Sequence, residues 1–220
     1  MKIVSLISSG IDSPVATYLI SKKTDEITLL HADIRPYTDE REIDNFILIS
    51  KHLKKITSKK IKAYILPHGQ ALTIFKRNCE NRLTCVFCKR MLVRYAEKIA
   101  IKENADAIVM GDSLGQVASQ TIQNIAAIEE TVNTPILRPL IGFDKEEIIK
   151  IAKEIKTYEL STRPSLPCSA VPKKPSTRAK IDKLTENEKL IESEKLVEKI
   201  AKFLCAEYGT GIIHCETLRG

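Results

Sequence analysis

The sequence predicts an α/β fold, a doubly wound and mostly parallel five-stranded sheet with helices on both faces. Two observations support this prediction. Short apolar runs alternate along the chain with longer segments of helical character, which is the order of right-handed βαβ units. The most distinctive polar segments, at 8–13, 31–37 and 111–116, each follow an apolar run. Ligands of such sheets bind beyond the carboxyl ends of the strands, so these segments mark the expected site.

The expected strands are, in chain order, 2–7, 27–33, 61–66, 107–110 and roughly 136–140. The expected helices between them are 14–23, 39–55, 70–78, 86–103, 116–128 and 144–155. The composition changes after residue 160. Residues 163–175 hold four of the nine prolines, which predicts a stiff loop without helix. Residues 180–208 predict one charged amphipathic helix. We therefore expect one domain over 1–178 and a helical extension over 179–220, packed on that domain or at a dimer interface.

The composition is that of a globular protein with an anionic partner. The 220 residues are 43% hydrophobic and 29% charged, and the net charge is +7, which favours a ligand such as ATP or RNA. No apolar stretch reaches membrane-spanning length, so no membrane association is expected. Met1 and Lys2 lead directly into a predicted strand, and no signal peptide is expected. Six cysteines without secretory features predict a cytoplasmic location.

The sequence SSGIDS at residues 8–13, here called the phosphate loop, follows the apolar run 3–7. Small residues let the backbone approach an anion, and the next helix presents free N–H groups and the positive end of its dipole. Ser13 is a candidate cap for that helix, and Pro14 suits its first turn. The spacing is not that of a Walker loop. The hexapeptide resembles the SGGxDS loop of PP-loop ATP pyrophosphatases, with Ser9 where a glycine is usual, although an ordinary strand–turn–helix corner would also account for it.

Two cysteines, Cys85 and Cys88, are spaced to lie on one face in the first turn of the predicted helix 86–103. A helix N-terminus lowers the pKa of a thiol and favours the thiolate. One such pair forms half of a zinc site or part of an iron–sulfur site, and Cys168 in the proline-rich loop is the obvious third ligand. A structural zinc completed by a fourth ligand such as Cys79 is the alternative.

A longer set of motifs, in the same order along the chain, resembles the tRNA 4-thiouridine synthetase (ThiI) family. These motifs are GIDSPVA at 10–16, CKRM at 88–91, GDSLGQVASQT at 111–121 and PILRPLIGFDKEEII at 135–149. The resemblance spans residues 3 to about 178. Read without it, the loop at 111–116 is also compatible with an ordinary turn whose polar residues are exposed.

The resemblance implies a set of nucleotide-binding residues. Those expected to hold ATP are Ser8, Ser9, Gly10, Asp12, Ser13, His31, Ala32, Arg35, Gly111, Ser113 and Gln116. Asp12 would also help to place Mg²⁺, and Lys145 matches a family lysine implicated in activity. Asp144 and Glu147 are spaced as a capping box, which independently predicts Lys145 in the first turn of a helix. A cation there opposes the helix dipole, so an anionic ligand is a reasonable compensation.

The resemblance further implies an ATP-dependent sulfurtransferase that adenylates a base carbonyl, in a tRNA uridine, and replaces the oxygen by sulfur to give 4-thiouridine. Asp12, Lys145 and Cys168 would be the catalytic residues. Cys85, Cys88 and Cys168 would hold a [4Fe–4S] cluster that carries sulfide, with zinc as the alternative metal and a persulfide on Cys168 as the alternative sulfur donor. Thiolation of another base or of a thiazole or other small-molecule precursor, a nucleotide-binding module without turnover, and a zinc-stabilised RNA-binding subunit stay open.

The resemblance also bears on partners. Family members carry a THUMP domain ahead of the PP-loop domain, whereas the phosphate loop here lies close to residue 1. We therefore expect RNA capture by a separate THUMP-type protein, by a homodimer or by the basic surface of the domain. The basic residues that would form such a surface are Arg77, Arg82, Lys89, Arg90, Lys173, Lys174 and Arg178.

Overall fold

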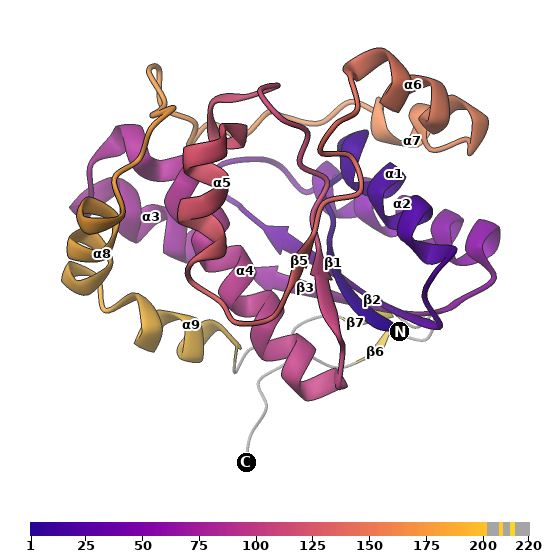
Figure 1. Ribbon diagram of the computed structural model, residues 1–220, viewed down its shortest axis with the longest axis horizontal. Helices are drawn as coiled ribbons and strands as arrows, with labels where there is room; N and C mark the ends of the chain where they lie inside the picture. The colour runs from indigo at the N-terminus through magenta and orange to yellow at the C-terminus, as the bar shows by residue number, and fades with distance from the viewer. Residues whose placement is uncertain (202–206, 209–211, 214–220) are drawn as a thin grey trace.

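The computed structural model describes residues 1–201, 207–208 and 212–213 (Figure 1). Its strands are β1 (Lys2–Leu6), β2 (Glu26–Asp33), β3 (Lys60–Pro67), β4 (Ala107–Val109), β5 (Ile136–Leu137), β6 (Glu207–Tyr208) and β7 (Ile212–Ile213). Its α-helices are α1 (Asp12–Ser21), α2 (Arg41–Thr57), α3 (Gly69–Asn78), α4 (Thr84–Glu103), α5 (Ile122–Glu129), α6 (Lys145–Glu154), α7 (Tyr158–Ser161), α8 (Ile181–Leu190) and α9 (Ser193–Ala201). None of these helices is long and apolar enough to cross a membrane.

The strands form one sheet in the order β5–β4–β1–β2–β3–β7–β6. The five predicted strands are all parallel, which confirms the predicted doubly wound sheet. The chain runs outward from β1 to β3 and then returns to place β4 on the other side of β1. The boundary between β1 and β4 is therefore the switch point at which such sheets bind ligands. The short strands β6 and β7 were not predicted, and β6 lies in the stretch expected to be helical.

Side chains of the strands alternate between two apolar layers. Ile3 and Leu29 face the layer that includes Phe46 of α2, whereas Val4 and Leu30 face the layer that includes Phe87 of α4. Figure 1 shows α1, α2 and α6 on one side of the sheet and α3, α4 and α5 on the other. The central strands are thus buried on both faces, and the edge formed by their carboxyl ends is left for a ligand.

Two predicted helices differ from the structure. The helix expected over 116–128 begins only at Ile122, because the side chain of Thr121 caps it by accepting a hydrogen bond from the backbone N–H of Asn124 at 3.3 Å. The helix expected over 180–208 is interrupted between α8 and α9, where Glu192 adopts a left-handed φ of 46°. Residues 202–206 of that prediction lie outside the described residues.

A buried ion cluster joins α8 to α4. Glu188 accepts hydrogen bonds from Arg90 at 2.6 and 2.9 Å and from Arg94 at 2.7 Å. Burial acts to raise the pKa of Glu188, but the two guanidinium groups outweigh it and the pKa is lowered. Arg90 is only 2% exposed, so its place in the predicted RNA-facing surface is wrong.

The division of the chain into two parts at residue 178 stays a prediction.

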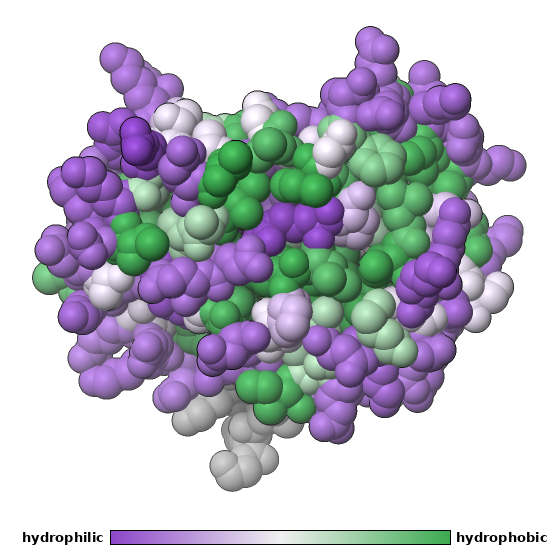
Figure 2. All heavy atoms as spheres, in the orientation of Figure 1, coloured by the Kyte–Doolittle hydropathy of each residue, from purple (hydrophilic) through white to green (hydrophobic). Residues whose placement is uncertain are grey.

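The face seen in Figure 2 is not uniformly polar. Hydrophobic residues extend over much of its central part and surround a hydrophilic area. Exposed large apolar side chains include Leu114 and Val117, which follow β4, and Ile141, which follows β5. The loops beyond the carboxyl ends of these two strands therefore expose apolar as well as polar side chains.

We predict that Glu188→Ala lowers the free energy of unfolding by about 3 kcal/mol, because it leaves Arg90 buried without its main partner. Chemical denaturation followed by circular dichroism measures this change. Glu186→Ala, an exposed position on the same helix, is the matched control and should change stability little. Equal stability of the two variants would show that the buried ion cluster contributes nothing to docking α8.

Candidate functional site

The phosphate loop connects β1 to α1 and is held by its own serines. The Ser8 backbone N–H donates to Ser13 Oγ at 2.9 Å, and the Gly10 N–H donates to Ser8 Oγ at 3.2 Å. Ser13 was a candidate helix cap, but α1 begins at Asp12 and its N-cap residue, Ile11, makes no side-chain cap. The first N–H groups of α1 are therefore not satisfied by a cap, which suits an anion.

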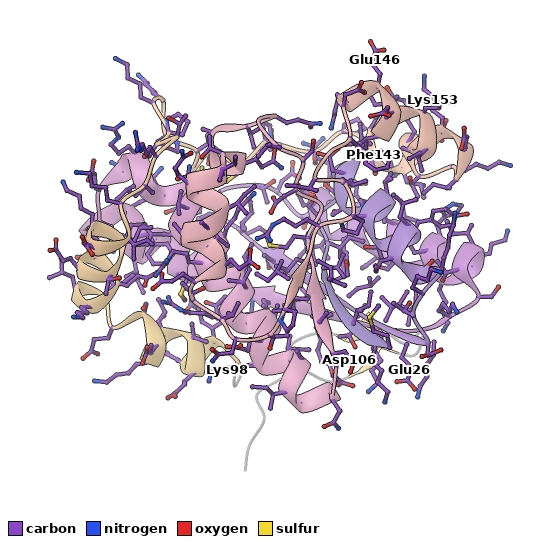
Figure 3. The ribbon with its side chains drawn as sticks, viewed as in Figure 1. Glu26, Lys98, Asp106, Phe143, Glu146 and Lys153 are labelled. Atoms are coloured by element: carbon purple, nitrogen blue, oxygen red, sulfur yellow. The ribbon has the colours of Figure 1, made fainter. Side chains whose placement is uncertain are left out.

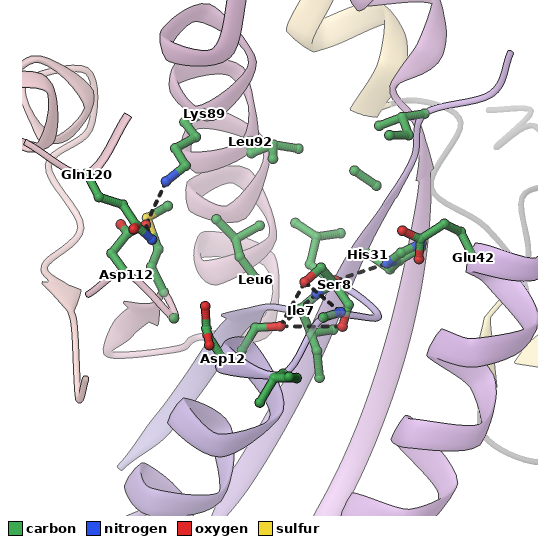
Figure 4. Close-up of a pocket in the computed structure, with 18 residues that line it drawn as sticks. Leu6, Ile7, Ser8, Asp12, His31, Glu42, Lys89, Leu92, Asp112 and Gln120 are labelled. Atoms are coloured by element: carbon green, nitrogen blue, oxygen red, sulfur yellow. Dashed lines mark hydrogen bonds and ion pairs between the residues drawn. The ribbon is translucent and has the colours of Figure 1, made fainter. Parts of the chain in front are cut away.

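A cavity of about 320 Å³ lies beside this loop at the β1–β4 switch point (Figure 4). Its walls come from the phosphate loop, from the ends of β2 and β4, from α4 and from the start of α2. The residues named from the sequence that line it are Ser8, Gly10, Asp12, Ser13, His31, Ala32 and Gly111. Segments far apart in the chain thus meet where the topology predicts a ligand.

Gly111 makes the junction between β4 and the phosphate loop possible. A Cβ atom at this position would lie 2.7 Å from Ser13 Cα and 2.8 Å from Ser13 N. Those contacts are with backbone, so no side-chain rotation relieves them. Only a glycine lets the end of β4 approach the start of α1 this closely.

The far wall of the cavity carries two hydrogen-bond acceptors. His31 Nδ1 donates to the Ile7 carbonyl at 3.0 Å, its ring stacks on Phe46, and burial lowers its pKa. Nε2 of this neutral imidazole is consequently an acceptor. His31 Nε2 and Glu42 Oε2 are both buried and have no partner among the described residues. Buried polar atoms are normally paired, so this wall is suited to a ligand that donates hydrogen bonds.

Lys145 reaches the phosphate loop from α6. Its Nζ lies 2.5 Å from Asp12 Oδ1. The predicted capping box is confirmed, since Asp144 accepts from the Glu147 N–H and Glu147 accepts from the Asp144 N–H. Lys145 therefore occupies the first turn of α6, where its charge opposes the helix dipole and is compensated by Asp12.

A second charged group lies on the β4 side of the cavity. Asp112 is 3% exposed, and its carboxylate accepts from Lys89 Nζ at 2.7 Å, from Arg138 Nε at 3.4 Å and from Gln120 Nε2 at 3.4 Å. Burial acts to raise the pKa of Asp112, but Lys89 and Arg138 outweigh it and hold the pKa below its usual range. This carboxylate is ionised and is shared by two cations.

Cys85, Cys88 and Cys168 lie close enough for their charges to interact. Burial raises the pKa of Cys85, and Cys168 raises it further. Burial, followed by the charges of the other two thiols, raises the pKa of Cys88 to about 12. The prediction that the helix N-terminus lowers these pKa values is wrong, because burial outweighs the helix dipole. Cys79 lies elsewhere, against the Asn187 carbonyl.

The loop that carries Cys168 is tied to the segment after β2. The Ser169 N–H donates to the Tyr37 carbonyl at 2.8 Å, and the Thr38 hydroxyl donates to the Leu166 carbonyl at 2.6 Å. These bonds hold the predicted stiff loop against the body of the domain. Cys168 is thereby held next to α4, although the two are far apart in the sequence.

The three cysteines are the kind of ligands that bind a metal ion or an iron–sulfur cluster. Three cysteines are donors that iron–sulfur clusters and zinc prefer, and His68 Nε2 lies 3.2 Å from Cys88 Sγ. Burial lowers the pKa of His68 to about 4, so the imidazole is neutral. Within residues 1–200, no three His, Cys, Asp or Glu side chains are already arranged as metal ligands. The donor set fits such a group, and its ligand geometry is not preformed.

Comparison with known proteins assigns the family. The family model described as "Thiamine biosynthesis protein (ThiI)" matches residues 1–209, nearly the whole chain. The chain belongs to the ThiI family. Relatives within and beyond the archaea carry the description "Probable tRNA sulfurtransferase". The protein from Methanobrevibacter smithii is 45% identical over 191 residues, and that from Thermoanaerobacter pseudethanolicus is 40% identical over 189 residues. The chain covers 49% and 50% of their lengths, so it spans about half the length of these relatives.

Solved structures agree with this family. The chain superposes on a 4-thiouridine synthetase–RNA complex with bound ATP at a TM-score of 0.86 and 34% identity, covering 91% of this chain and 53% of that one. The U34-tRNA thiolase NcsA from Methanococcus maripaludis, solved with its [4Fe–4S] cluster, matches at a TM-score of 0.51 and 18% identity, covering 91% and 73%. The similarity to NcsA shows that the two proteins share a fold.

Four residues expected from the ThiI resemblance lie outside the cavity. Ser9 is buried in the phosphate loop, and Arg35 is paired with Asp33. Ser113 donates to the Phe143 carbonyl at 2.7 Å, and Gln116 donates to Ser113, in a separate hollow beside Lys145. Ser113 and Gln116 therefore help to shape the loop from which Lys145 extends.

The sequence argument did not place three polar wall residues in the cavity: Glu42, Lys89 and Gln120. Lys89 had been assigned to an RNA-facing surface, but its side chain is only 21% exposed and turned to Asp112. Its position in the sequence, directly after Cys88 at the start of α4, could have indicated that Lys89 lies at the site. That position lies at the carboxyl end of the sheet because α4 runs antiparallel to the strand that follows it.

We predict that Gly111→Ala weakens ATP binding by about tenfold, because the added methyl group pushes the β4 end away from the phosphate loop. Titration calorimetry with ATP measures the affinity. Gly142→Ala is the matched control, since a Cβ there meets nothing within 4 Å. Unchanged ATP affinity in Gly111→Ala would show that the close approach of β4 to α1 does not contribute to ATP binding.

Proposed function

We propose that this chain catalyses ATP-dependent thiolation of RNA, adenylating a uridine carbonyl in tRNA and replacing its oxygen by sulfur to give 4-thiouridine. The observation that carries the proposal is the cavity lined by the uncapped N-terminus of α1 and by the Lys89–Asp112 pair, with the Lys145–Asp12 pair at the phosphate loop and Cys88 next to Lys89 on α4. The descriptions of the relatives as tRNA sulfurtransferases support it, as does the ATP and RNA of the 4-thiouridine synthetase complex.

The cavity gives the nucleotide an orientation. The phosphate loop and the first turn of α1 supply N–H donors for phosphate oxygens. The opposite wall supplies acceptors, His31 Nε2 and a Glu42 carboxylate oxygen, which match the amine and hydroxyl donors of adenosine. ATP would therefore lie with its phosphates over α1 and its nucleoside toward β2. Asp12 would hold Mg²⁺, which supplies further neutralisation of the phosphate charge.

In the first step, the base carbonyl oxygen attacks the α-phosphorus and pyrophosphate leaves. The chain contributes mainly position and charge. The phosphate loop fixes the phosphates, and Lys145 offers a cation that Asp12 holds beside them. The products are pyrophosphate and an adenylated base whose oxygen now leaves readily as AMP.

In the second step, sulfur displaces AMP. Cys85, Cys88 and Cys168 would hold a [4Fe–4S] cluster, which would supply the sulfur for this displacement; the electrostatic interaction among the three thiols supports this assignment. Zinc is the alternative metal, and a persulfide on Cys168 is the alternative donor. Cys79, Cys85, Cys88 and Cys168 form no disulfide among the described residues, and unpaired thiols are usual in a reducing compartment such as the cytoplasm. A homodimer and a separate THUMP-type protein stay predictions.

We predict that the chain, given tRNA, ATP, Mg²⁺ and sulfide, forms 4-thiouridine and releases pyrophosphate, and that Asp12→Asn and Lys145→Gln each slow this by about a hundredfold. Nucleoside mass spectrometry and pyrophosphate release follow the two products. Lys150→Gln, an exposed lysine on the same helix as Lys145, is the matched control. ATP binding without pyrophosphate release in the wild type would favour a nucleotide-binding module instead.

A second prediction concerns the cysteines. Protein purified without oxygen should contain iron and acid-labile sulfide, and Cys85→Ala, Cys88→Ala and Cys168→Ala should each lose them because each removes one thiolate ligand. Cys79→Ala is the matched control and should retain both, since Cys79 lies against the Asn187 carbonyl. Zinc in place of iron, or loss of iron only in the Cys79 variant, would contradict the three-cysteine cluster.

A further inference from the structure

Lys89 stands between the phosphate loop and the cysteines. It directly follows Cys88 on α4, and its side chain lines the same cavity as Ser8 and Gly111. Figure 4 shows its ammonium group directed at Asp112 and not out of the molecule. No other lysine among the described residues lines this cavity.

Within the described part of the chain, the Asp112 carboxylate has two partners besides Lys89. Arg138 Nε contacts the other carboxylate oxygen at 3.4 Å, and Gln120 Nε2 donates to Oδ1 at 3.4 Å. Arg138 is in turn fixed by Glu129 at 2.8 Å, and it is only 8% exposed. If Lys89 left, Asp112 would keep a buried guanidinium partner and an amide, so the carboxylate would not be stranded.

The two cations differ in their freedom to move. Arg138 is held at both ends by carboxylates, whereas Lys89 has only Asp112 as an ion-pair partner among the described residues. A lysine has a flexible four-carbon stem and a point charge, so it can be redirected toward a phosphate oxygen within the same cavity. Lys89 is therefore the cation of the pair that is better able to change partner, and Arg138 would remain at Asp112.

We propose that Lys89 leaves Asp112 when the nucleotide enters and binds the α-phosphate, the one that becomes the phosphate of AMP. The α-phosphate is favoured because the base carbon that accepts sulfur is joined to it through one oxygen atom. A cation adjacent to the cysteines is therefore adjacent to that phosphate. Lys145 is paired with Asp12 at the phosphate loop and is left to the outgoing pyrophosphate.

This inference rests on the proposed function for its chemistry. When hydrosulfide attacks the adenylated carbon, a C–S bond forms and the C–O bond breaks. The electron pair of the C–O bond stays on the phosphate oxygen of AMP, and the hydrosulfide proton moves to the ring nitrogen of the thione. Lys89 would contact the phosphate on which charge accumulates, as a catalytic residue for this step.

Binding of AMP and of adenosine, measured by calorimetry on the whole chain, tests the proposal. Lys89→Gln should weaken AMP binding by about tenfold or more, because a charge-assisted hydrogen bond is lost, and should leave adenosine binding unchanged. Lys89→Arg should recover part of the AMP affinity. Lys98→Gln, on the exposed side of the same helix (Figure 3), is the matched control and should bind both ligands like the wild type.

Asp112→Asn provides a second test, because it removes the carboxylate that competes for Lys89. AMP affinity should then be equal to or greater than that of the wild type. Unchanged AMP affinity in Lys89→Gln, or an equal loss for AMP and adenosine, would overturn the proposal. A Lys89-dependent AMP site in a chain that makes no thiolated RNA would leave this inference standing while the proposed function fails.

Discussion

The end of β4 and the start of α1 approach each other so closely that no side chain fits between them. Gly111 meets this condition, since a Cβ there would lie within 3 Å of the Ser13 backbone. The contact places Asp112 and the loop after it beside the phosphate loop, where Asp112 meets Lys89 and Arg138. The shape of the cavity and the Lys89–Asp112 pair both depend on this junction between neighbouring strands.

Two lysine–carboxylate pairs lie at the phosphate loop and in the cavity beside it. Lys145 is paired with Asp12 at the start of α1, and Lys89 is paired with Asp112 just after β4. Each carboxylate keeps a cation in place before an anionic ligand enters, which avoids an unpaired charge in a partly buried site. A polyphosphate entering the cavity would meet positive charge on both sides and hydrogen-bond acceptors at the far end.

The sequence was sufficient for the parts of this molecule that are encoded locally. Alternation of apolar runs predicted the five parallel strands, and the spacing of Asp144 and Glu147 predicted the capping box. Partners separated widely in the chain could not be predicted. Asp112 finds Lys89 and Arg138 only through the sheet order, and the buried pair of Arg90 with Glu188 needs the docking of α8. The thiol pKa values depend on burial, which is a property of the folded chain.

Cys168 lies on a loop that is anchored both at its ends and immediately around the cysteine. Ser169 and Leu166 bond to Tyr37 and Thr38. Arg163 Nε donates to Asn45 Oδ1 at 3.0 Å before this stretch, and the Ser176 N–H donates to the Arg82 carbonyl at 2.9 Å after it. The position of the sulfur atom is therefore set by the bonds that flank it, and the exposed stretch between these anchors serves as a connector. Such a design lets the connector change in length or sequence over evolution while the thiol keeps its place, because insertions at exposed loops cost little once the anchoring bonds are retained.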